Sequence, residues 1–142
     1  MVAAFPTLVQ VVLDTTDTRG LAEFYRQLLG YVYRPGDEQP PAGQPDPNGQ
    51  DWLVIQHPSG APRVAFQQVA ELAKSTWPTH DVPQQLHLDL SVPSVEEFNA
   101  QHQRALELGA TLVYDRSDDP QEPLHVYADP SGHPFCIFVA SS

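Results

Sequence analysis

The chain has 142 residues, one cysteine and a formal net charge of −11, with 18 acidic residues against 7 Lys and Arg. Its length suffices for one domain or two small modules without disulfide or metal support, and a single cysteine fits a reducing cytoplasm. The acidic balance argues against a nucleic-acid partner and is compatible with a cationic ligand or a solvated surface, and no segment resembles a signal peptide or a membrane helix.

The first half of the chain predicts a strand, a helix and three further strands. A β-branched apolar run at residues 8–13 is typical of a buried strand. Apolar residues at helical spacing follow the capping residue Asp17, and Gly30 ends the predicted helix. Residues 35–50 are rich in Pro, Gly, Asp and Gln, which predicts a long loop, either a lid or a mobile excursion. The remaining strands are expected at residues 31–34, 52–57 and 63–69.

The second half repeats this order. Residues 86–92 alternate strictly, so we expect leucines on the side that packs against a helix and His87, Asp89 and Ser91 on the other side. Ser94 and Glu97 have the spacing of a capping box, which predicts a helix that ends at Gly109. Three strands are then expected at residues 111–114, 124–128 and 135–139.

The two halves also match residue by residue. His-Pro-Ser-Gly-Ala-Pro at 57–62 corresponds to Asp-Pro-Ser-Gly-His-Pro at 129–134, and Gln10 in the first strand corresponds to His87 in the fifth. The sequence therefore predicts an α+β protein of two tandem βαβββ modules, a duplication whose mixed sheets curl around a central cavity. The modules are expected at residues 1–69 and 86–142, joined by a linker at 70–85, in one compact domain overall.

These motifs resemble the vicinal oxygen chelate superfamily, which includes glyoxalase I, bleomycin resistance proteins and extradiol dioxygenases. The resemblance is to glyoxalase-like domain proteins of the actinobacterial type, and it runs from about Leu8 to Val139. It rests on the end of the first helix at residues 24–30, on His-Leu-Asp-Leu at 87–90 and on the run at 127–136. It implies the fold, while the superfamily carries many reactions.

Metal-dependent members of the superfamily place ligands on the first, fourth, fifth and eighth strands, and the resemblance implies Gln10 and His87 as candidates at two of these positions. The other two fall on Val64 or Phe66 and on Cys136 or Phe138, where glutamates would be expected. Because Mg, Mn and Fe prefer carboxylate oxygens, the sequence does not support a glyoxalase I or dioxygenase site directly. No cofactor is therefore assigned, and a divalent metal remains the alternative.

His87 is the leading site candidate, because Asp89 lies two residues further along the same strand face and can orient or charge the imidazole. The pair is the expected catalytic group if the protein is an enzyme. The alternative is that His87 only lines the cavity. Cys136 is interpreted as a small buried residue without a local base. The expected ligand-binding set is Gln10, His87, Trp52, Phe66 and Cys136.

We therefore expect a small-molecule binding protein that holds a polar or cationic ligand in the cavity between the modules, without the usual metal. Two enzymatic alternatives stay open: a divalent-metal-dependent lyase, isomerase or dioxygenase, and a metal-free enzyme with His87 as general base. A stand-alone interaction module is a third interpretation. No nucleic-acid or membrane partner is expected, whereas a homodimer is. Trp77 is a candidate either for the dimer interface or for the wall of a hydrophobic cavity.

Overall fold

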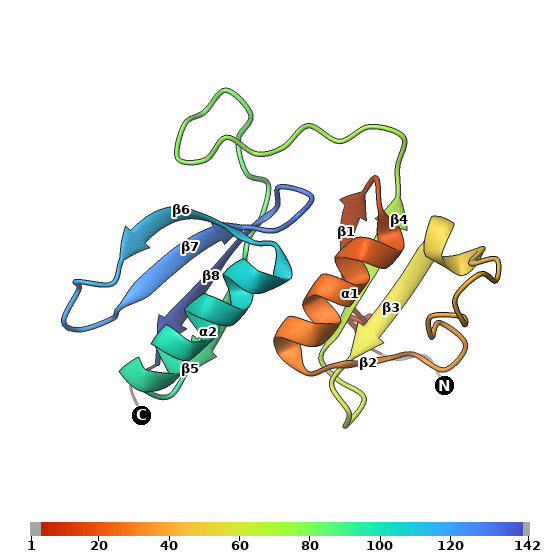
Figure 1. Cartoon of the computed structure of the whole chain (residues 1–142), viewed down its shortest axis with the longest axis horizontal. Coiled ribbons are helices and arrows are strands. Elements are labelled where there is room, and N and C mark those ends of the chain that lie inside the picture. Colours follow the sequence, from red (N-terminus) through yellow and green to blue (C-terminus); the bar gives the residue numbers. More distant parts are fainter. Residues whose placement is uncertain (1–3, 141–142) are drawn as a thin grey trace. The chain divides into compact units, whose positions relative to one another are not determined.

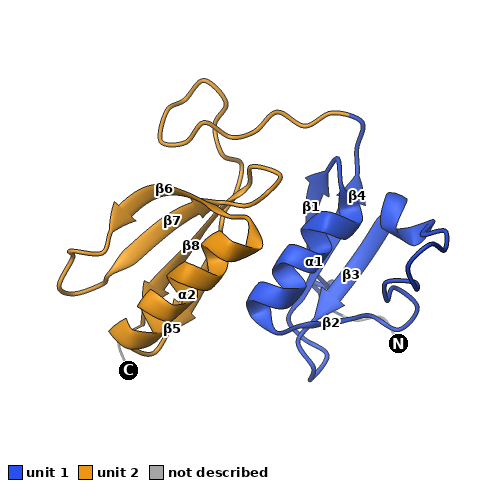
Figure 2. Ribbon diagram, in the orientation of Figure 1, with its two compact units in different colours: residues 1–70 blue, residues 71–142 orange. Residues whose placement is uncertain are grey.

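The computed structural model of the chain describes residues 4–140. The chain divides into two compact units, Met1–Ala70 and Glu71–Ser142, which are coloured separately in Figure 2. Each unit contains one α-helix against one face of a four-stranded mixed sheet (Figure 1). In the described residues, neither helix has the length and apolar character needed to cross a membrane.

Unit 1 and unit 2 have the same order of elements. Unit 1 contains β1 (Val11–Thr15), α1 (Thr18–Leu29), β2 (Val32–Tyr33), the short helix η1 (Asn48–Gln50), β3 (Trp52–Gln56) and β4 (Arg63–Gln68). Unit 2 contains β5 (Leu88–Val92), α2 (Val95–Leu108), β6 (Thr111–Arg116), β7 (Leu124–Ala128) and β8 (Pro134–Val139). The predicted α+β architecture of two βαβββ modules is confirmed.

Sheet topology makes the duplication explicit. The strand orders are β1-β4-β3-β2 and β5-β8-β7-β6, and in each sheet only the first pair is parallel. Val11 pairs with Val64 in unit 1, as Leu88 pairs with Phe135 in unit 2. One residue earlier on β1 and β5, Gln10 therefore corresponds to His87, as the sequence predicts. Both side chains lie just before their strands rather than within them.

The helix boundaries follow the predicted capping signals. Asp17 Oδ1 accepts a hydrogen bond from the Gly20 amide at 3.0 Å, and Ser94 Oγ accepts one from the Glu97 amide at 3.1 Å. Both helices end at a glycine in the left-handed conformation, Gly30 with φ 69° and Gly109 with φ 118°. Side-chain acceptors at the start and glycine at the end satisfy backbone groups that the helix leaves unpaired.

One face of β4 packs against α1 and contains Phe66. Phe66 is fully buried, and its ring stacks on Tyr25 of α1 with centroids 5.9 Å apart. Val64 lies on the same side of the strand, because side chains alternate along it. Phe66 therefore belongs to the core of unit 1, and its role in ligand binding stays a prediction. The fourth-strand position that faces away from α1 is Ala65, the counterpart of Cys136 in β8.

The long loop at residues 35–50 is anchored to the start of α1. The Arg19 guanidinium donates to both carboxylate oxygens of Asp46 at 2.8 Å and to the Asp37 carbonyl at 2.7 Å. Asp37 is itself buried, and its carboxylate accepts from the Val54 amide at 2.9 Å. A bidentate contact between a guanidinium and a carboxylate fixes both the position and the orientation of the two side chains. The loop is thus attached at two points to the helix and the sheet.

A polar cluster lies between α2 and the sheet of unit 2. The buried His125 stacks on Phe98 at a centroid distance of 4.4 Å and lies 4.3 Å from the ring of His102. The Tyr127 hydroxyl lies 2.7 Å from His102 Nδ1 and 3.2 Å from His125 Nδ1. Burial, followed by repulsion from His102, lowers the pKa of His125.

Candidate functional site

Unit 2 contains a pocket of about 340 Å³ on the side of its sheet opposite α2. The segment before β5 contributes Trp77, Gln84 and His87. The sheet contributes Asp89, Tyr114, Arg116, Leu124, Val126 and Cys136. All nine lining residues belong to unit 2, and a volume of this size fits a small molecule.

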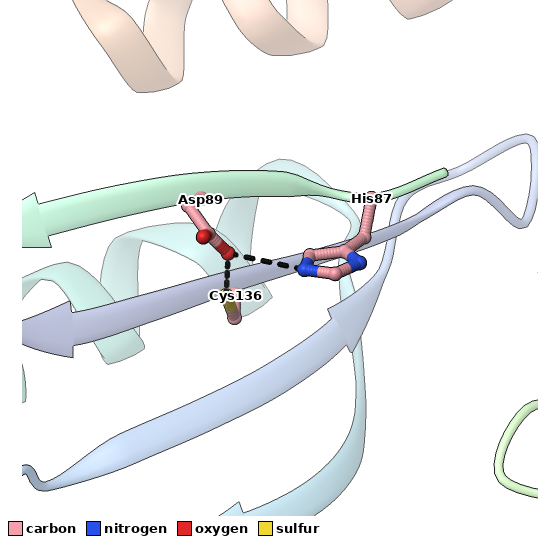
Figure 3. A group of neighbouring side chains, drawn as sticks. All are labelled: His87, Asp89 and Cys136. Carbon is pink, nitrogen blue, oxygen red and sulfur yellow. Dashed lines mark hydrogen bonds and ion pairs between the residues drawn. The ribbon is translucent and has the colours of Figure 1, made fainter.

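Three predicted site residues that line this pocket, His87, Asp89 and Cys136, are neighbours in space (Figure 3). His87 Nε2 lies 3.3 Å from Asp89 Oδ1, and the Cys136 thiol donates to the same oxygen at 2.7 Å. Asp89 and Cys136 are direct neighbours on the parallel strands β5 and β8, so the backbone register sets their contact. The sequence predicted the pairing of His87 with Asp89 but not the bond from Cys136.

The Cys136 thiol is poorly suited to nucleophilic chemistry. Burial, together with the bond to the Asp89 carboxylate and its negative charge, raises the pKa of Cys136 to about 12. A thiol must lose its proton to act as a nucleophile, and both influences oppose that loss. Cys136 therefore remains a neutral hydrogen-bond donor to Asp89 near neutral pH.

An aromatic corner forms the opposite side of the pocket. The rings of Trp77 and Tyr114 meet edge to face, with centroids 6.0 Å apart and planes at 85°. Trp77 lies on a loop that is closed by hydrogen bonds between Thr76 and Val82 in both directions, at 2.8 Å each. This loop closure positions the indole before any ligand arrives.

Two side chains of the pocket, Asp89 and Arg116, carry formal charge near neutral pH. The Asp89 side chain is 60% exposed, and the Arg116 guanidinium donates to Asp119 at 2.9 Å. Of the 18 acidic residues, 11 lie in unit 2, against 3 of the 7 Lys and Arg. Unit 2 thus holds most of the excess negative charge, which favours the approach of cations over anions.

The other predicted site residues lie in unit 1. Gln10 directly precedes β1, and its Oε1 is buried without a hydrogen-bond partner, as is Nε of Arg63 at the start of the adjacent strand β4. Trp52 begins β3 and is partly buried. Neither Gln10 nor Trp52 lines the pocket of unit 2.

Sequence reasoning missed several pocket residues. For one of them, Tyr114, the structure shows why. The sequence placed no function on Tyr114 or Arg116, and it interpreted Trp77 only as an interface or cavity residue. A register shift between Leu112 and Tyr114 in the β6–β7 pair moves Tyr114 to the face of Val126. Simple alternation would have placed Tyr114 on the side of Leu112, towards α2.

The four strand positions that the superfamily resemblance associates with metal are occupied by Gln10, Ala65, His87 and Cys136. None of these is a carboxylate, and the alanine offers no ligand atom at all. Among the described residues, one group of three potential ligands has its donor atoms within 4.8 Å of one another: His87, Asp89 and Cys136. This nitrogen, oxygen and sulfur set differs from the oxygen-rich sets that manganese and magnesium prefer.

A family model described as the glyoxalase-like domain matches residues 10–138 of the chain. The chain belongs to the glyoxalase-like domain family. The match covers both units and confirms the resemblance to the vicinal oxygen chelate superfamily. No curated protein matches the chain in sequence.

Solved structures support the same assignment of fold. A glyoxalase/bleomycin resistance protein/dioxygenase family enzyme from Burkholderia phytofirmans PsJN has a TM-score of 0.66 and 17% identity, covering 94% of this chain and 98% of that one. A possible glyoxalase from Bacillus cereus has a TM-score of 0.63 and 15% identity, with coverages of 92% and 96%.

A variant of the fosfomycin resistance protein FosX from Listeria monocytogenes, complexed with Mn(II) and a dihydroxypropylphosphonic acid, is also similar. Its TM-score is 0.67 at 15% identity, and the match covers 96% of this chain and 94% of that one. Identities this low show a shared fold and leave the reaction to be argued from the site.

Proposed function

We propose that this glyoxalase-like protein binds a small polar or cationic molecule in the pocket of unit 2 and does so without a metal ion. The observation that carries the proposal is the Asp89 carboxylate in the pocket wall. The ion-pair contact from His87 and the hydrogen bond from Cys136 both go to Oδ1, so Oδ2 is left to a ligand. A carboxylate oxygen accepts most strongly from a charged donor.

The chemistry of the side chains favours binding without a metal such as manganese. The structure has no carboxylate at the two positions where the superfamily resemblance implies glutamates, because Ala65 and Cys136 stand there. Beside His87, a hard divalent ion would therefore find one carboxylate and one soft sulfur ligand, which is a poor set for octahedral oxygen coordination. The residues do not fit the manganese found in the FosX relative.

The main alternative is a divalent-metal-dependent lyase, isomerase or dioxygenase of the same superfamily. The grouping of His87, Asp89 and Cys136 favours it, because these three residue types together suit a softer ion such as zinc. A metal-free enzyme is a variant of the main proposal. In that case His87 is the general base, and Asp89 orients its imidazole across the 3.3 Å contact.

Thermal unfolding tests the proposal. The protein is purified without chelator, its metal content is measured, and a panel of small polar and cationic molecules is screened with and without EDTA. We expect panel members to raise the Tm equally in both conditions, because binding stabilises the folded state irrespective of metal. Stabilisation by divalent metal alone, lost in His87→Ala, would instead support the metal-dependent alternative.

The Asp118→Asn variant serves as the control for Asp89→Asn, because both remove one negative charge from unit 2 and Asp118 does not line the pocket. We expect the ligand-induced rise in Tm to disappear in Asp89→Asn and to persist in Asp118→Asn. The homodimer also stays a proposal, and light scattering checks it by a mass of twice 15.7 kDa.

A further inference from the structure

The pocket floor changes in character from one edge of the sheet to the other. Asp89 on β5 pairs with Cys136 on β8, Cys136 with Val126 on β7, and Val126 with Tyr114 on β6. These four residues form one row across the sheet. With about 4.8 Å between neighbouring strands, the row is roughly 14 Å long.

Polarity along this row is graded rather than mixed. The β5 edge has the carboxylate of Asp89, the middle has the Cys136 side chain and the apolar Val126, and the β6 edge has the ring of Tyr114. Trp77 stands perpendicular to that ring, so the two aromatic planes make a right-angled corner. An aromatic group placed there would pack against both rings.

Charge compensation distinguishes the two charged side chains of the pocket. The guanidinium of Arg116 is already paired with Asp119. Among the described residues, Asp89 lies beside His87 and has no ion pair with a Lys or Arg. The excess of acidic residues in unit 2 acts in the same direction, towards cations. An anionic ligand would therefore have to compete with Asp119 for Arg116, and the net negative charge of unit 2 would repel it.

We infer that the ligand is an elongated amphipathic organic cation, bound with its amine at Asp89 Oδ2 and an aromatic or apolar end in the corner of Trp77 and Tyr114. This inference rests on the proposed binding function and narrows it to one chemical class and one orientation. The side chains of Asp89 and Tyr114 occupy the two ends of this row. A ligand roughly 10 Å long therefore fits between them. A compact polar ligand would leave the aromatic corner unfilled.

Matched probes separate the contributions of the two ends. Phenylbutylamine has an amine and a ring at this spacing, phenylbutanol has the same shape without charge, phenylbutyrate has the opposite charge, and butylamine lacks the ring. Titration calorimetry gives the dissociation constants, and amide NMR shifts of pocket residues identify the site. We expect phenylbutylamine to bind about tenfold or more tightly than each of the other three.

Two variants test which side chain binds the amine end of the probe and which binds its aromatic end. Asp89→Asn should remove the preference for phenylbutylamine over phenylbutanol, while the control Asp118→Asn retains it. Tyr114→Ala should weaken phenylbutylamine and phenylbutanol by the same factor, because it changes the corner and not the carboxylate. Circular dichroism of each variant verifies that unit 2 stays folded.

The outcomes distinguish this inference from the proposed function. Equal binding of amine and alcohol, or tighter binding of phenylbutyrate, would overturn the inferred class and leave the pocket as a binding site. Binding of butylamine as tight as that of phenylbutylamine would overturn the inferred orientation. If none of the four probes shifts the pocket resonances and divalent metal alone does so, the inference and the proposed function both fail.

Discussion

His102 and His125 share one hydroxyl group, that of Tyr127, through the Nδ1 atoms of both imidazoles. A phenol has one proton to donate, so it donates to one Nδ1 and accepts from the other. When both rings are neutral, the two histidines therefore carry their protons on different nitrogens. If both histidines were protonated, two imidazolium rings would lie with their centroids 4.3 Å apart.

This cluster should make the stability of the protein depend on pH. Burial and His102 lower the pKa of His125, so the unfolded state, with a pKa near 6.5, binds its proton first as pH falls. The free energy of unfolding should be unaffected by His125 above that pH and should decrease below it, by at most about 1.4 kcal/mol per pH unit for this proton. Urea unfolding at several pH values between about 7.5 and 5.5 measures the slope.

Replacement of the imidazole provides the control for that slope. His125→Phe keeps a ring on Phe98 and removes the titration, so its unfolding free energy should vary much less over the same pH range. His80→Phe changes an exposed histidine and should retain the slope of the unsubstituted protein. A flat pH profile in the unsubstituted protein would contradict the assignment.

Arg19 and Asp46 lie 27 residues apart in sequence and hold the long loop of unit 1. Arg19→Lys keeps the charge but loses the bidentate contact with Asp46. We expect the free energy of unfolding to fall by about 1–3 kcal/mol and hydrogen exchange in residues 35–50 to become faster. Exchange measured by mass spectrometry locates the change. Unchanged protection of this loop would show that other contacts hold it.

Asp46→Asn is the complementary variant. Asp46 Oδ1 also accepts from the Gly49 amide, and an asparagine oxygen can keep that bond while the charge on Arg19 loses its partner. Exchange should therefore increase in residues 35–50 as it does in Arg19→Lys. The hydrogen bonds from Arg19 are the largest cause of the lowered pKa of Asp46. The contribution of the Arg19–Asp46 pair to the free energy of unfolding should therefore decrease as pH falls below about 3.8.

Cys136 should resist thiol reagents in the folded protein. Its side chain is buried and its pKa is raised to about 12, so the thiolate required for disulfide exchange is scarce. We expect slow reaction with Ellman's reagent near pH 8 and rapid, stoichiometric reaction in urea. Asp89→Asn removes a carboxylate that disfavours the thiolate, so it should speed the reaction of the folded protein, whereas Asp118→Asn should not. Rapid labelling of the folded, unsubstituted protein would contradict this picture.

Phe66 should behave as a core residue and not as a site residue. Phe66→Ala leaves a cavity under Tyr25 and should lower the free energy of unfolding by about 3–5 kcal/mol. Urea unfolding measures the loss, and Trp52→Ala, at a partly exposed position, should cost less. The affinity of the unit 2 pocket for phenylbutylamine should be the same in both variants. A selective loss of that affinity in Phe66→Ala would instead support Phe66 as a binding residue.

Local signals made the order of elements predictable. Asp17, Ser94, Gly30 and Gly109 mark helix ends through their own side chains or backbone freedom, and the sequence contains those signals directly. The repeated Pro-Ser-Gly turns made the duplication visible for the same reason. The pairing of His87 with Asp89 also followed from alternation within one strand.

Contacts between distant segments were not predictable in this way. In β4, Val64, Ala65 and Phe66 are all apolar and all buried, so no alternation distinguishes the helix side from the other face. In β6, the bulge that brings Tyr114 to the pocket depends on pairing with β7 and leaves no mark in the local pattern. The Arg19–Asp46 bond required knowledge of the loop path.

All nine residues around the pocket come from residues 71–142, with Trp77 on the segment that joins the two repeats. The segment is held to the second repeat by the close packing of Lys74 on Gly132, where even a Cβ would lie 2.6 Å from the lysine Cγ. A recombination crossover placed just before residue 71 would thus transfer the entire pocket to a new chain. In chimeras between relatives, ligand preference should be inherited with the C-terminal half.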